Sequence, residues 1–416
     1  MEFSQIKNAD LFARHLQPLL KEALSDTPAV LINGPRQSGK TTLAQQCAPK
    51  FPYISLDDAT QLAAAQNDPV GFVNRIDCAV IDEIQHAPGL LSAIKLSIDS
   101  DRRPGRFLLT GSANIMSLPM ISDSLAGRVE VHTLLPLSNA EIAGHSPDFL
   151  ERALTQRWHD RDIAAQLVIG DSIIEHVLTG GYPEMRSRTS MRRRQAWAQS
   201  YLTTLIERDI QDVARINDAT RIPQLMVILA MLSGQMLNLT QIGGQIGLNA
   251  HTVEKYIGIL EKLFLVRRLP AWRRNELVRL IKTPKIHFMD AGLHAALARV
   301  SPELLGVDRT RFGAILESWV HGELLKTLSL TSKQWFLSHY RDKDQVEVDF
   351  VVESPLRAIL AIEVKAAATV TAADFKGIRR FREHCGEAFV SGIVLYNGRE
   401  ALPFGKDLWA VPLSYL

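Results

Sequence analysis

The chain has 416 residues, of which 46% are hydrophobic and 22% charged. At about 150 residues per domain, this length predicts two to four domains. The composition excludes an intrinsically disordered or collagen-like protein. Lys and Arg number 47 against 45 Asp and Glu, which leaves a formal net charge of +2. Any binding of nucleic acid must therefore come from a local basic patch.

Cysteine usage and hydropathy narrow the class further. Cys47, Cys78 and Cys385 are too few and too scattered for a disulfide framework or a zinc site. The longest apolar run, residues 225–232, lasts eight residues, whereas a bilayer span needs about 18 to 20. The N-terminal segment lacks the basic and apolar parts of a signal peptide. We therefore expect a cytoplasmic protein that has no membrane partner.

The first motif lies in residues 29–48. Residues 29–33 predict a buried parallel strand, and residues 41–48 predict a helix. The segment between them matches G-x-x-x-x-G-K-[ST] at every fixed position: Gly34, Pro35, Arg36, Gln37, Ser38, Gly39, Lys40 and Thr41, with Thr42 next. In such a loop the backbone amides and the helix N-terminus hold phosphates. Lys40 would reach the β- and γ-phosphates, and the Thr41 hydroxyl would ligate Mg²⁺. ATP and Mg²⁺ are the expected cofactors.

Two further strand ends complete the expected nucleotide site. Residues 78–81 predict a second strand that ends in Asp82 and Glu83. Asp82 would hold Mg²⁺ through water, and Glu83 would polarise the attacking water, which favours hydrolysis over transfer to another substrate. Residues 106–109 predict a third strand, at whose tip Ser112, or second Thr110, would orient this water; the alternative is a plain strand-end turn. Arg128 could neutralise charge in the transition state, in its own chain or across an interface, or be a surface arginine.

The motifs GPRQSGKTT, CAVIDEIQHAP, LLTGS, AGRV and LPLS resemble a bacterial and archaeal family of AAA-type ATPases that carry a C-terminal domain of unknown function. The resemblance continues through GGYPE at residues 180–184 and ERDI at residues 207–210. It implies nucleotide-site roles for Lys40, Thr41, Asp82, Glu83 and Ser112. It also makes Arg128 and Arg208 candidate switch or finger residues, and implies a possible homo-oligomer in which a neighbour completes the site.

The middle of the chain predicts two helical regions. Residues 151–221 read as a helical lid or connector, in which five arginines among residues 186–194 indicate either phosphate contacts or a solvated helix face. Residues 222–285 predict a winged helix, with helices over 223–236 and 252–262 and a basic wing after residue 265. Thr252, Lys255, Arg273 and Arg274 would then contact DNA. The alternative is a winged helix that serves only as a structural module.

The last domain, residues 286–416, carries a second set of polar residues. Residues 346–352 and 359–365 predict two antiparallel strands joined by a short turn. Asp349 would face Glu363 across the pair and bind a divalent metal with it, and Lys365 would stand beside the attacked phosphate. An upstream amphipathic helix would add Glu317.

This arrangement resembles the PD-(D/E)xK core of restriction endonucleases, although Val348 stands where the motif has proline. The resemblance implies attack on a phosphodiester by metal-activated water. The alternative is a nuclease-like fold without activity.

The expected fold class is α/β: an AAA-type P-loop domain with a parallel sheet at 1–150, a helical connector at 151–221, a winged helix at 222–285 and a restriction-endonuclease-like α/β domain at 286–416. Three functions are compatible with it. The first is an ATPase whose nucleotide cycle controls a domain that processes DNA or RNA. The second is an ATP-dependent switch or scaffold with an inactive nuclease fold and protein partners. The third is a P-loop kinase, against which Glu83 and the Thr-Gly-Ser strand tip argue.

Overall fold

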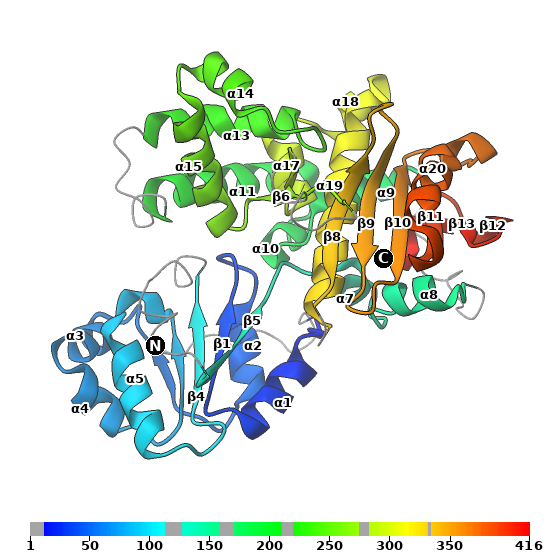
Figure 1. Cartoon of the computed structure of the whole chain (residues 1–416). Helices are drawn as coiled ribbons and strands as arrows, with labels where there is room; N and C mark the ends of the chain where they lie inside the picture. Colours follow the sequence, from blue (N-terminus) through cyan, green and yellow to red (C-terminus); the bar gives the residue numbers. More distant parts are fainter. Residues whose placement is uncertain (1–11, 113–126, 159–169, 210–218, 274–282, 332–333) are drawn as a thin grey trace. The chain divides into compact units, whose positions relative to one another are not determined.

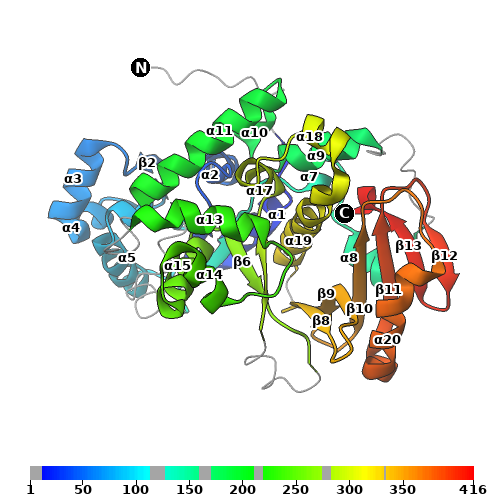
Figure 2. The ribbon, with the colours of Figure 1, turned by 90° about the horizontal axis from the view of Figure 1, so that it is seen from above.

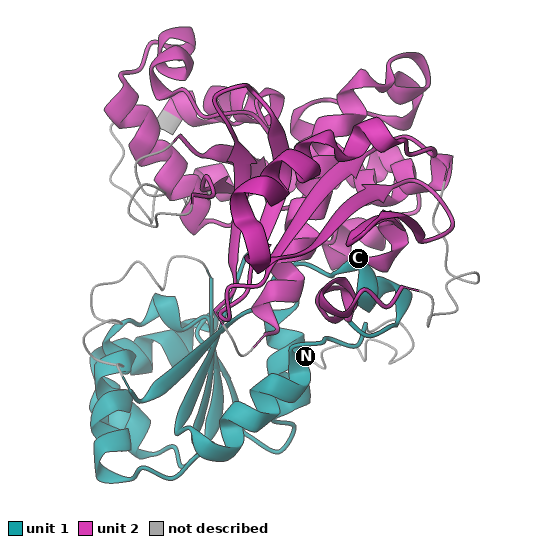
Figure 3. Ribbon diagram, turned by 45° about the vertical axis from the view of Figure 1, so that its right-hand side comes forward, with its two compact units in different colours: residues 1–147 teal, residues 148–416 magenta. Residues whose placement is uncertain are grey.

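A computed structural model describes residues 12–112, 127–158, 170–209, 219–273, 283–331 and 334–416 of the chain. Its contacts divide the chain into two compact units, residues 1–147 and 148–416 (Figure 3). Each unit contains its own sheet and its own hydrophobic core. The division falls near the boundary expected at residue 150, and the finer divisions expected at 221 and 285 stay predictions.

The first unit alternates strands and helices. Its strands are β1 (Ala29–Asn33), β2 (Tyr53–Ser55), β3 (Ala79–Asp82), β4 (Phe107–Gly111) and β5 (Val129–Thr133). Its helical elements are α1 (Gln17–Asp26), α2 (Lys40–Cys47), α3 (Ala59–Asn67), α4 (Pro69–Asn74), the 3₁₀ turn η2 (Ile84–His86), α5 (Gly89–Ser100) and α7 (Asn139–Ala143).

The sheet of the first unit is parallel, in the order β2-β3-β4-β1-β5. Helices α1 and α2 lie on one face, and α3, α4 and α5 on the other (Figure 1). Every residue of β1, β3 and β4 is buried, which explains their continuous apolar runs. Because all five strands run the same way, their carboxyl ends meet at one edge. That edge carries the loop after Asn33, the carboxylate of Asp82 and the tip of β4.

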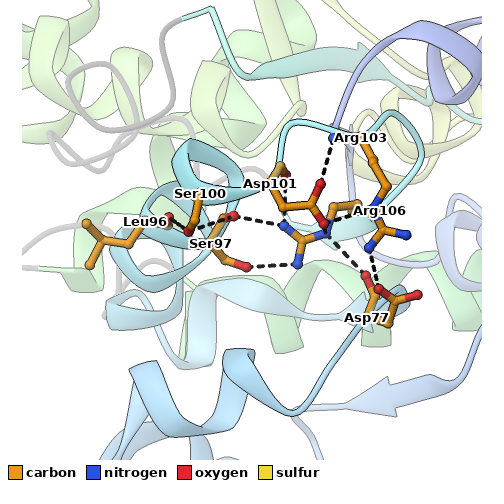
Figure 4. Close-up of polar contacts among 7 residues, drawn as sticks. All are labelled: Asp77, Leu96, Ser97, Ser100, Asp101, Arg103 and Arg106. Carbon is orange, nitrogen blue, oxygen red and sulfur yellow. Dashed lines mark hydrogen bonds and ion pairs between the residues drawn. The ribbon is translucent and has the colours of Figure 1, made fainter.

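A buried arginine at the start of β4 ties this sheet to α5 (Figure 4). Arg106 is 7% exposed. Its Nη1 donates to the carbonyls of Ser97, at 2.9 Å, and Asp101, at 3.0 Å, and its Nη2 donates to Ser97 Oγ. These are carbonyls at the C-terminal end of α5, where a cation is favourable. The nearby Arg103 contacts Asp77 and Asp101 but is largely exposed.

The second unit begins with helices and ends in a mixed sheet. Its helical elements are α8 (Phe149–Thr155), α9 (Asp171–Thr179), α10 (Pro183–Arg186), α11 (Met191–Thr204), the π-helical turn η4 (Leu205–Asp209), η5 (Ala219–Arg221), α13 (Ile222–Met231), α14 (Leu239–Ile246), α15 (Ala250–Lys262), α17 (Ala291–Leu297), α18 (Pro302–Val307), η6 (Arg309–Arg311), α19 (Phe312–Ser329), η7 (Ala372–Phe375), α20 (Lys376–Cys385), η8 (Gly386–Ala388) and η9 (Leu413–Tyr415). Its strands are β6 (Val266–Leu269), β7 (Lys285–Phe288), β8 (Phe336–Arg341), β9 (Glu347–Glu353), β10 (Ile359–Lys365), β11 (Phe389–Tyr396), β12 (Leu402–Gly405) and β13 (Leu408–Pro412).

Helices α13, α14 and α15 precede an antiparallel two-stranded ribbon of β6 and β7. Asn238 and Asn249 cap α14 and α15 with their side chains, and Gly247 forms the turn between these helices in a left-handed conformation, with φ +70°. The helix expected over 223–236 ends earlier, at Met231, because Gly234 turns the chain with φ +80° and donates its amide to the Ile286 carbonyl. Strand β7 crosses the expected boundary at 285, so this division cuts through the ribbon.

The C-terminal sheet has the order β12-β13-β11-β10-β9-β8. Strands β9 and β10 are antiparallel neighbours, as expected, whereas β10, β11 and β13 are parallel. Helix α20 packs against β9, β10 and β11 through Ile378 and Phe381 (Figure 2). His321 of α19 stacks on Phe350, whose side chain lies on the opposite face from Val351 in the α20 core. Of the helices in the described ranges, none is long and apolar enough to cross a membrane.

Candidate functional site

The loop between β1 and α2 has the backbone shape that a phosphate-binding loop requires. Gly34 has φ +152° and Gly39 has φ +96°. A Cβ at Gly34 would lie 2.2 Å from the Leu134 carbonyl oxygen, so no larger residue fits there without a shift of the backbone. Asn33 Oδ1 accepts the Gly34 amide at 2.9 Å. The two fixed glycines of the motif are thus explained by geometry.

Lys40 begins α2 and is almost fully buried. Its Nζ donates to the carbonyls of Gly34, at 3.1 Å, and Pro35, at 2.9 Å, so the ammonium lies over the loop itself. No acidic residue stands in the first turn of α2, which leaves the positive helix end unopposed locally. A lysine and the positive N-terminal end of a helix, both at one loop, suit a polyphosphate.

An arginine that the motif does not include fixes this loop from outside. Arg14 donates through Nη1 to the Ser38 carbonyl at 2.7 Å and through Nη2 to the Leu135 carbonyl at 2.6 Å. Its Nε donates to Glu141 Oε1 at 3.0 Å, and both side chains of this pair are almost buried. Arg14 precedes all predicted elements, and no local sequence signal identifies it.

Asp82 lies opposite the loop, and its carboxylate accepts hydrogen bonds from three hydroxyl groups. Thr41 Oγ1 is 3.0 Å from Asp82 Oδ2 and 3.2 Å from Oδ1. The Tyr53 hydroxyl donates to Oδ2 at 2.6 Å, and Thr110 Oγ1 donates to Oδ1. Burial, together with this hydrogen bond and the charge of Asp82, raises the pKa of Tyr53, so the phenol stays protonated. The sequence missed Tyr53, because a tyrosine on a short edge strand has no motif.

The Thr41 hydroxyl and the Asp82 carboxylate therefore fit Mg²⁺. Both supply hard oxygen atoms at the mouth of the phosphate loop, and Mg²⁺ prefers such ligands together with water and phosphate oxygens. Thr41 and Asp82 are the metal ligands expected from the sequence, and the structure brings their side chains into contact.

Glu83 follows Asp82 in a left-handed conformation, with φ +58°. Its amide donates to Thr110 Oγ1 at 3.1 Å, and its carboxylate accepts a hydrogen bond from Gln85 Nε2. Gln85 Oε1 in turn accepts the Ser112 amide at 3.3 Å. The structure thus places Thr110 directly on Asp82 and Glu83, and links Ser112 to them through Gln85. Thr110, the second choice in the sequence, has the closer contacts.

Of the two candidate switch or finger arginines, Arg128 and Arg208, the structure describes the side chain of Arg128 alone. Strand β5 pairs with β1 in parallel, with Ala29 beside Val129. Arg128 therefore precedes the amino end of β5, whereas the phosphate loop follows the carboxyl end of β1, about 16 Å away for five residues of strand. Arg128 forms a bidentate ion pair with Asp99, at 2.6 and 3.2 Å. This placement does not bring Arg128 to the nucleotide edge of its own sheet. The side chain of Arg208 lies outside the described residues.

The second polar cluster lies on β9, β10 and α19. The β9–β10 ladder ends at Ile362 beside Phe350, and continuing its register puts Glu363 beside Asp349, as expected. Asp349 Oδ2 accepts the Val364 amide at 2.9 Å, and Lys365 Nζ donates to Glu363 Oε1 at 3.2 Å. Glu317 from α19 lies close enough to interact with them. Burial and the charge of Asp349 raise the pKa of Glu317. The four expected residues thus lie in one cluster.

A lysine that the sequence analysis did not single out as a site residue stands in this cluster. Lys285 Nζ lies 3.5 Å from Glu317 Oε1, 3.6 Å from Glu347 Oε2 and 3.9 Å from Asp349 Oδ1. Burial alone would lower the pKa of Lys285, but these carboxylates raise it above its ordinary value. Burial also raises the pKa of Asp349 and of Glu363.

The divalent metal expected at Asp349 and Glu363 stays a prediction. Across the described ranges, no group of three or more His, Cys, Asp or Glu side chains is arranged to hold a metal ion. The ammonium of Lys285 lies 3.9 Å from Asp349 Oδ1, so in this conformation it stands beside a carboxylate that the metal would use.

The expected DNA-contacting residues lie on α15 and after β6. Lys255, together with His251 and Lys262, is exposed, and Thr252 is half-buried. These positions share one face of α15 by helical spacing. Glu254 and Glu261 instead bind Arg268 of β6. Arg273 Nη2 donates to the Arg341 carbonyl at 3.2 Å, and Arg274 lies outside the described residues.

The arginine run at residues 186–194 is partly used within the unit. Arg188 pairs with Glu184 and Arg194 with Glu175, whereas Arg192 and Arg193 are exposed on α11. These contacts agree with a solvated helix face.

Three family models match separate parts of the chain. An AAA domain matches residues 26–143, and two domains of unknown function, DUF8612 and DUF4143, match residues 170–304 and 312–416. The uncharacterized proteins Rv2008c of Mycobacterium tuberculosis and Mb2031c of Mycobacterium bovis are each 28% identical over 404 residues, which cover 95% of this chain and 82% of each relative.

Solved structures show only weak similarity. The RuvB Holliday junction branch migration motor of Thermotoga maritima is 18% identical over 62% of this chain and 90% of its own, with a TM-score of 0.29. A STAND protein with a tetratricopeptide repeat sensor from Pyrococcus horikoshii is 14% identical over 78% of this chain and 51% of its own, with a TM-score of 0.27. The matched AAA model, the parallel sheet and the phosphate loop together identify residues 26–143 as an AAA-type P-loop domain.

Proposed function

We propose that this protein is an Mg²⁺-dependent ATPase whose nucleotide cycle controls its C-terminal, nuclease-like domain. The single observation that carries the ATPase proposal is the contact between Thr41 on the phosphate loop and Asp82 at the tip of β3. This contact supports the proposal, because Thr41 and Asp82 would be the metal ligands, Thr41 follows Lys40 in the chain and Glu83 follows Asp82, as phosphoryl transfer to water would need.

The proposed reaction uses this chain's residues in four roles. The loop amides and Lys40 bind the β- and γ-phosphates. Thr41 and Asp82 would hold Mg²⁺, which would neutralise charge on the phosphates. Glu83 accepts a proton from the attacking water as the water oxygen bonds to the γ-phosphorus and the bond from that phosphorus to the bridging oxygen breaks, so that ADP leaves. Thr110 fixes Glu83 through its amide and Asp82 through its carboxylate.

Phosphate release from ATP tests this proposal. We expect hydrolysis by wild type to be lost in Lys40→Ala and in Glu83→Gln, and retained in Glu22→Gln, a control that changes an exposed carboxylate on α1. ATP binding should survive in Glu83→Gln. Equal hydrolysis in wild type and Glu83→Gln would remove Glu83 from the reaction.

The proposal for the C-terminal domain is supported by the shared register of Asp349 and Glu363 with Lys365 and Glu317 nearby. DNA and RNA, incubated with Mg²⁺ or Mn²⁺ and with or without ATP, provide the test. Cleavage that is lost in Asp349→Ala and retained in Asp344→Ala, an exposed neighbour, would support a nuclease. Equal results for wild type and Asp349→Ala would leave the alternative, an ATP-dependent switch or scaffold with an inactive nuclease fold and protein partners.

We also propose α15 as the element that contacts nucleic acid, in the manner of a winged helix. The exposed face of His251, Lys255 and Lys262 supports this, since phosphate contacts need accessible cations. Fluorescence anisotropy with labelled duplex DNA should show weaker binding in Lys255→Ala than in Lys406→Ala, an exposed lysine on the β12–β13 turn. If Lys255→Ala binds DNA as well as wild type does, the alternative remains that the winged helix serves only as a structural module.

Arg128 is proposed to act only across an interface between copies, because its own phosphate loop is at the other edge of the sheet. Light scattering with and without an ATP analogue measures whether copies assemble. A monomer under both conditions would exclude this role and the proposed homo-oligomer.

A further inference from the structure

Lys285 enters the acidic cluster from a different part of the second unit. Its backbone belongs to the β6–β7 ribbon, where it pairs with Leu269, and it also forms a bridge with Met236. The carboxylates that surround it come from α19 and β9, inside the part matched by DUF4143, whereas Lys285 lies inside the part matched by DUF8612. The side chain is only 4% exposed. The position of the ammonium is therefore fixed by the ribbon and not by the domain that it neutralises.

For two of the carboxylates, Glu317 and Asp349, Lys285 is the cation in direct contact. Lys365 pairs with Glu363, and Arg341 pairs with Glu347 at 2.8 Å. Among the described side chains, Lys285 is the one lysine or arginine whose charged nitrogen lies within 4 Å of a carboxylate oxygen of Glu317 or Asp349. A buried carboxylate that stays ionised without a counter-charge is costly, so the ammonium of Lys285 stabilises the charged forms of these two groups.

The surroundings of the cluster also point to a cation. His287, two residues along β7, is fully buried, and its Nε2 lies 3.7 Å from Glu317 Oε1. Neither ring nitrogen of His287 has a hydrogen-bond partner in the described structure. Glu363 Oε2 is likewise buried without a partner. These groups could ligate or orient a cation that replaced the ammonium.

An ammonium and a divalent cation cannot occupy this place together. Divalent cations bind carboxylate oxygens at about 2.0 to 2.6 Å, whereas the carboxylate oxygens here stand 3.5 to 3.9 Å from Lys285 Nζ. A second positive charge a few ångströms from the ammonium would be strongly repelled in this buried environment.

We propose that Lys285 is a tethered counter-ion that occupies the cation position between Glu317 and Asp349 and excludes a divalent metal from it. This inference rests on the proposed nuclease-like role of the C-terminal domain, because it concerns the carboxylates that a metal-dependent nuclease would use.

Binding of Mn²⁺ to the full-length chain without nucleotide tests the proposal. Free Mn²⁺ is measured by electron paramagnetic resonance in wild type, Lys285→Met, Lys285→Met with Asp349→Asn, and Lys343→Met, a matched control on an exposed loop nearby. We expect Lys285→Met to bind Mn²⁺ at least tenfold more tightly than wild type. This gain should disappear in the double variant and be absent from the control.

Two results would overturn the proposal. One is Mn²⁺ binding by Lys285→Met no tighter than by wild type, in a variant whose tryptophan fluorescence shows a folded second unit. The other is tight, Asp349-dependent Mn²⁺ binding by wild type itself, which needs no Lys285 variant to fold. The assay does not measure cleavage. If Lys285→Met gains Mn²⁺ binding but no variant cleaves nucleic acid, the proposal that Lys285 is a counter-ion stands and the proposal of a nuclease is rejected.

Discussion

Replacing Arg14 by alanine tests how the phosphate loop is held. The substitution removes the donors to the Ser38 and Leu135 carbonyls and the ion pair with Glu141. Glu141 is 6% exposed and Arg14 8%, so the carboxylate that remains is poorly hydrated. We expect the first unit to lose stability and the phosphate loop to lose its fixed shape.

The magnitude follows from burial. Removing one partner of a buried ion pair costs about 3–5 kcal/mol, because the other charge is left uncompensated. Glu141 keeps the amides of His15, at 2.8 Å, and Ser138, at 3.0 Å. We therefore expect the lower end, about 3 kcal/mol, which is a large part of the 5–15 kcal/mol that typically stabilise a domain.

Urea unfolding with two probes separates the units. All six tryptophans lie between residues 158 and 409, in the second unit, whereas far-ultraviolet circular dichroism reports both. Arg14→Ala should shift the circular dichroism transition and leave the tryptophan transition in place. The control Arg103→Ala, whose side chain is 58% exposed, should shift neither. A change below about 1 kcal/mol in Arg14→Ala would refute the view that this ion pair holds the loop.

Three further predictions concern the loop, the base and a buried histidine. Gly34→Ala should abolish ATP binding in calorimetry because its Cβ would meet the Leu134 carbonyl, whereas Gly89→Ala, which meets only an ordinary contact, should bind normally. Glu83→Gln should lower the rate of ATP hydrolysis about 100-fold or more without weakening ATP binding, since only proton transfer is lost; a fall below tenfold in a phosphate-release assay would contradict this role. Burial lowers the pKa of His294 to about 4, whereas the pKa in the unfolded chain is about 6.5. The neutral imidazole therefore makes its full contribution to the free energy of unfolding above pH 6.5, and up to about 3 kcal/mol of this contribution is lost as the pH falls towards 4. Unfolding followed by tryptophan fluorescence from pH 7 to 4 should show a shallower loss in His294→Gln than in wild type, and parallel curves would contradict the assignment.

The sequence predicted those features that local pattern encodes. The apolar runs before Gly34 and Asp82 identified β1 and β3, because strands buried on both faces are uniformly apolar. The spacing of Asp349 and Glu363 predicted their register across β9 and β10, since an antiparallel pair with a short turn has few alternatives.

The residues that were missed act through tertiary contacts. Arg14 reaches Glu141 from 127 positions away, and Tyr53 reaches Asp82 from an edge strand. Lys285 is the last residue of the winged helix expected at 222–285, but its burial among Glu317, Glu347 and Asp349 depends on how the ribbon meets α19 and β9. Charge patterning in one dimension could not reveal that contact, and so it gave no sign of the ammonium that stands beside the expected metal ligand Asp349.

Titration calorimetry of the full-length protein with ATP and Mg²⁺ tests the central claim most directly. We expect wild type to take up one ATP per chain, and Lys40→Ala, with an unchanged circular dichroism spectrum, to bind it at least tenfold more weakly. Well-folded wild type that takes up no adenine nucleotide, or equal affinity in the two proteins, would contradict it.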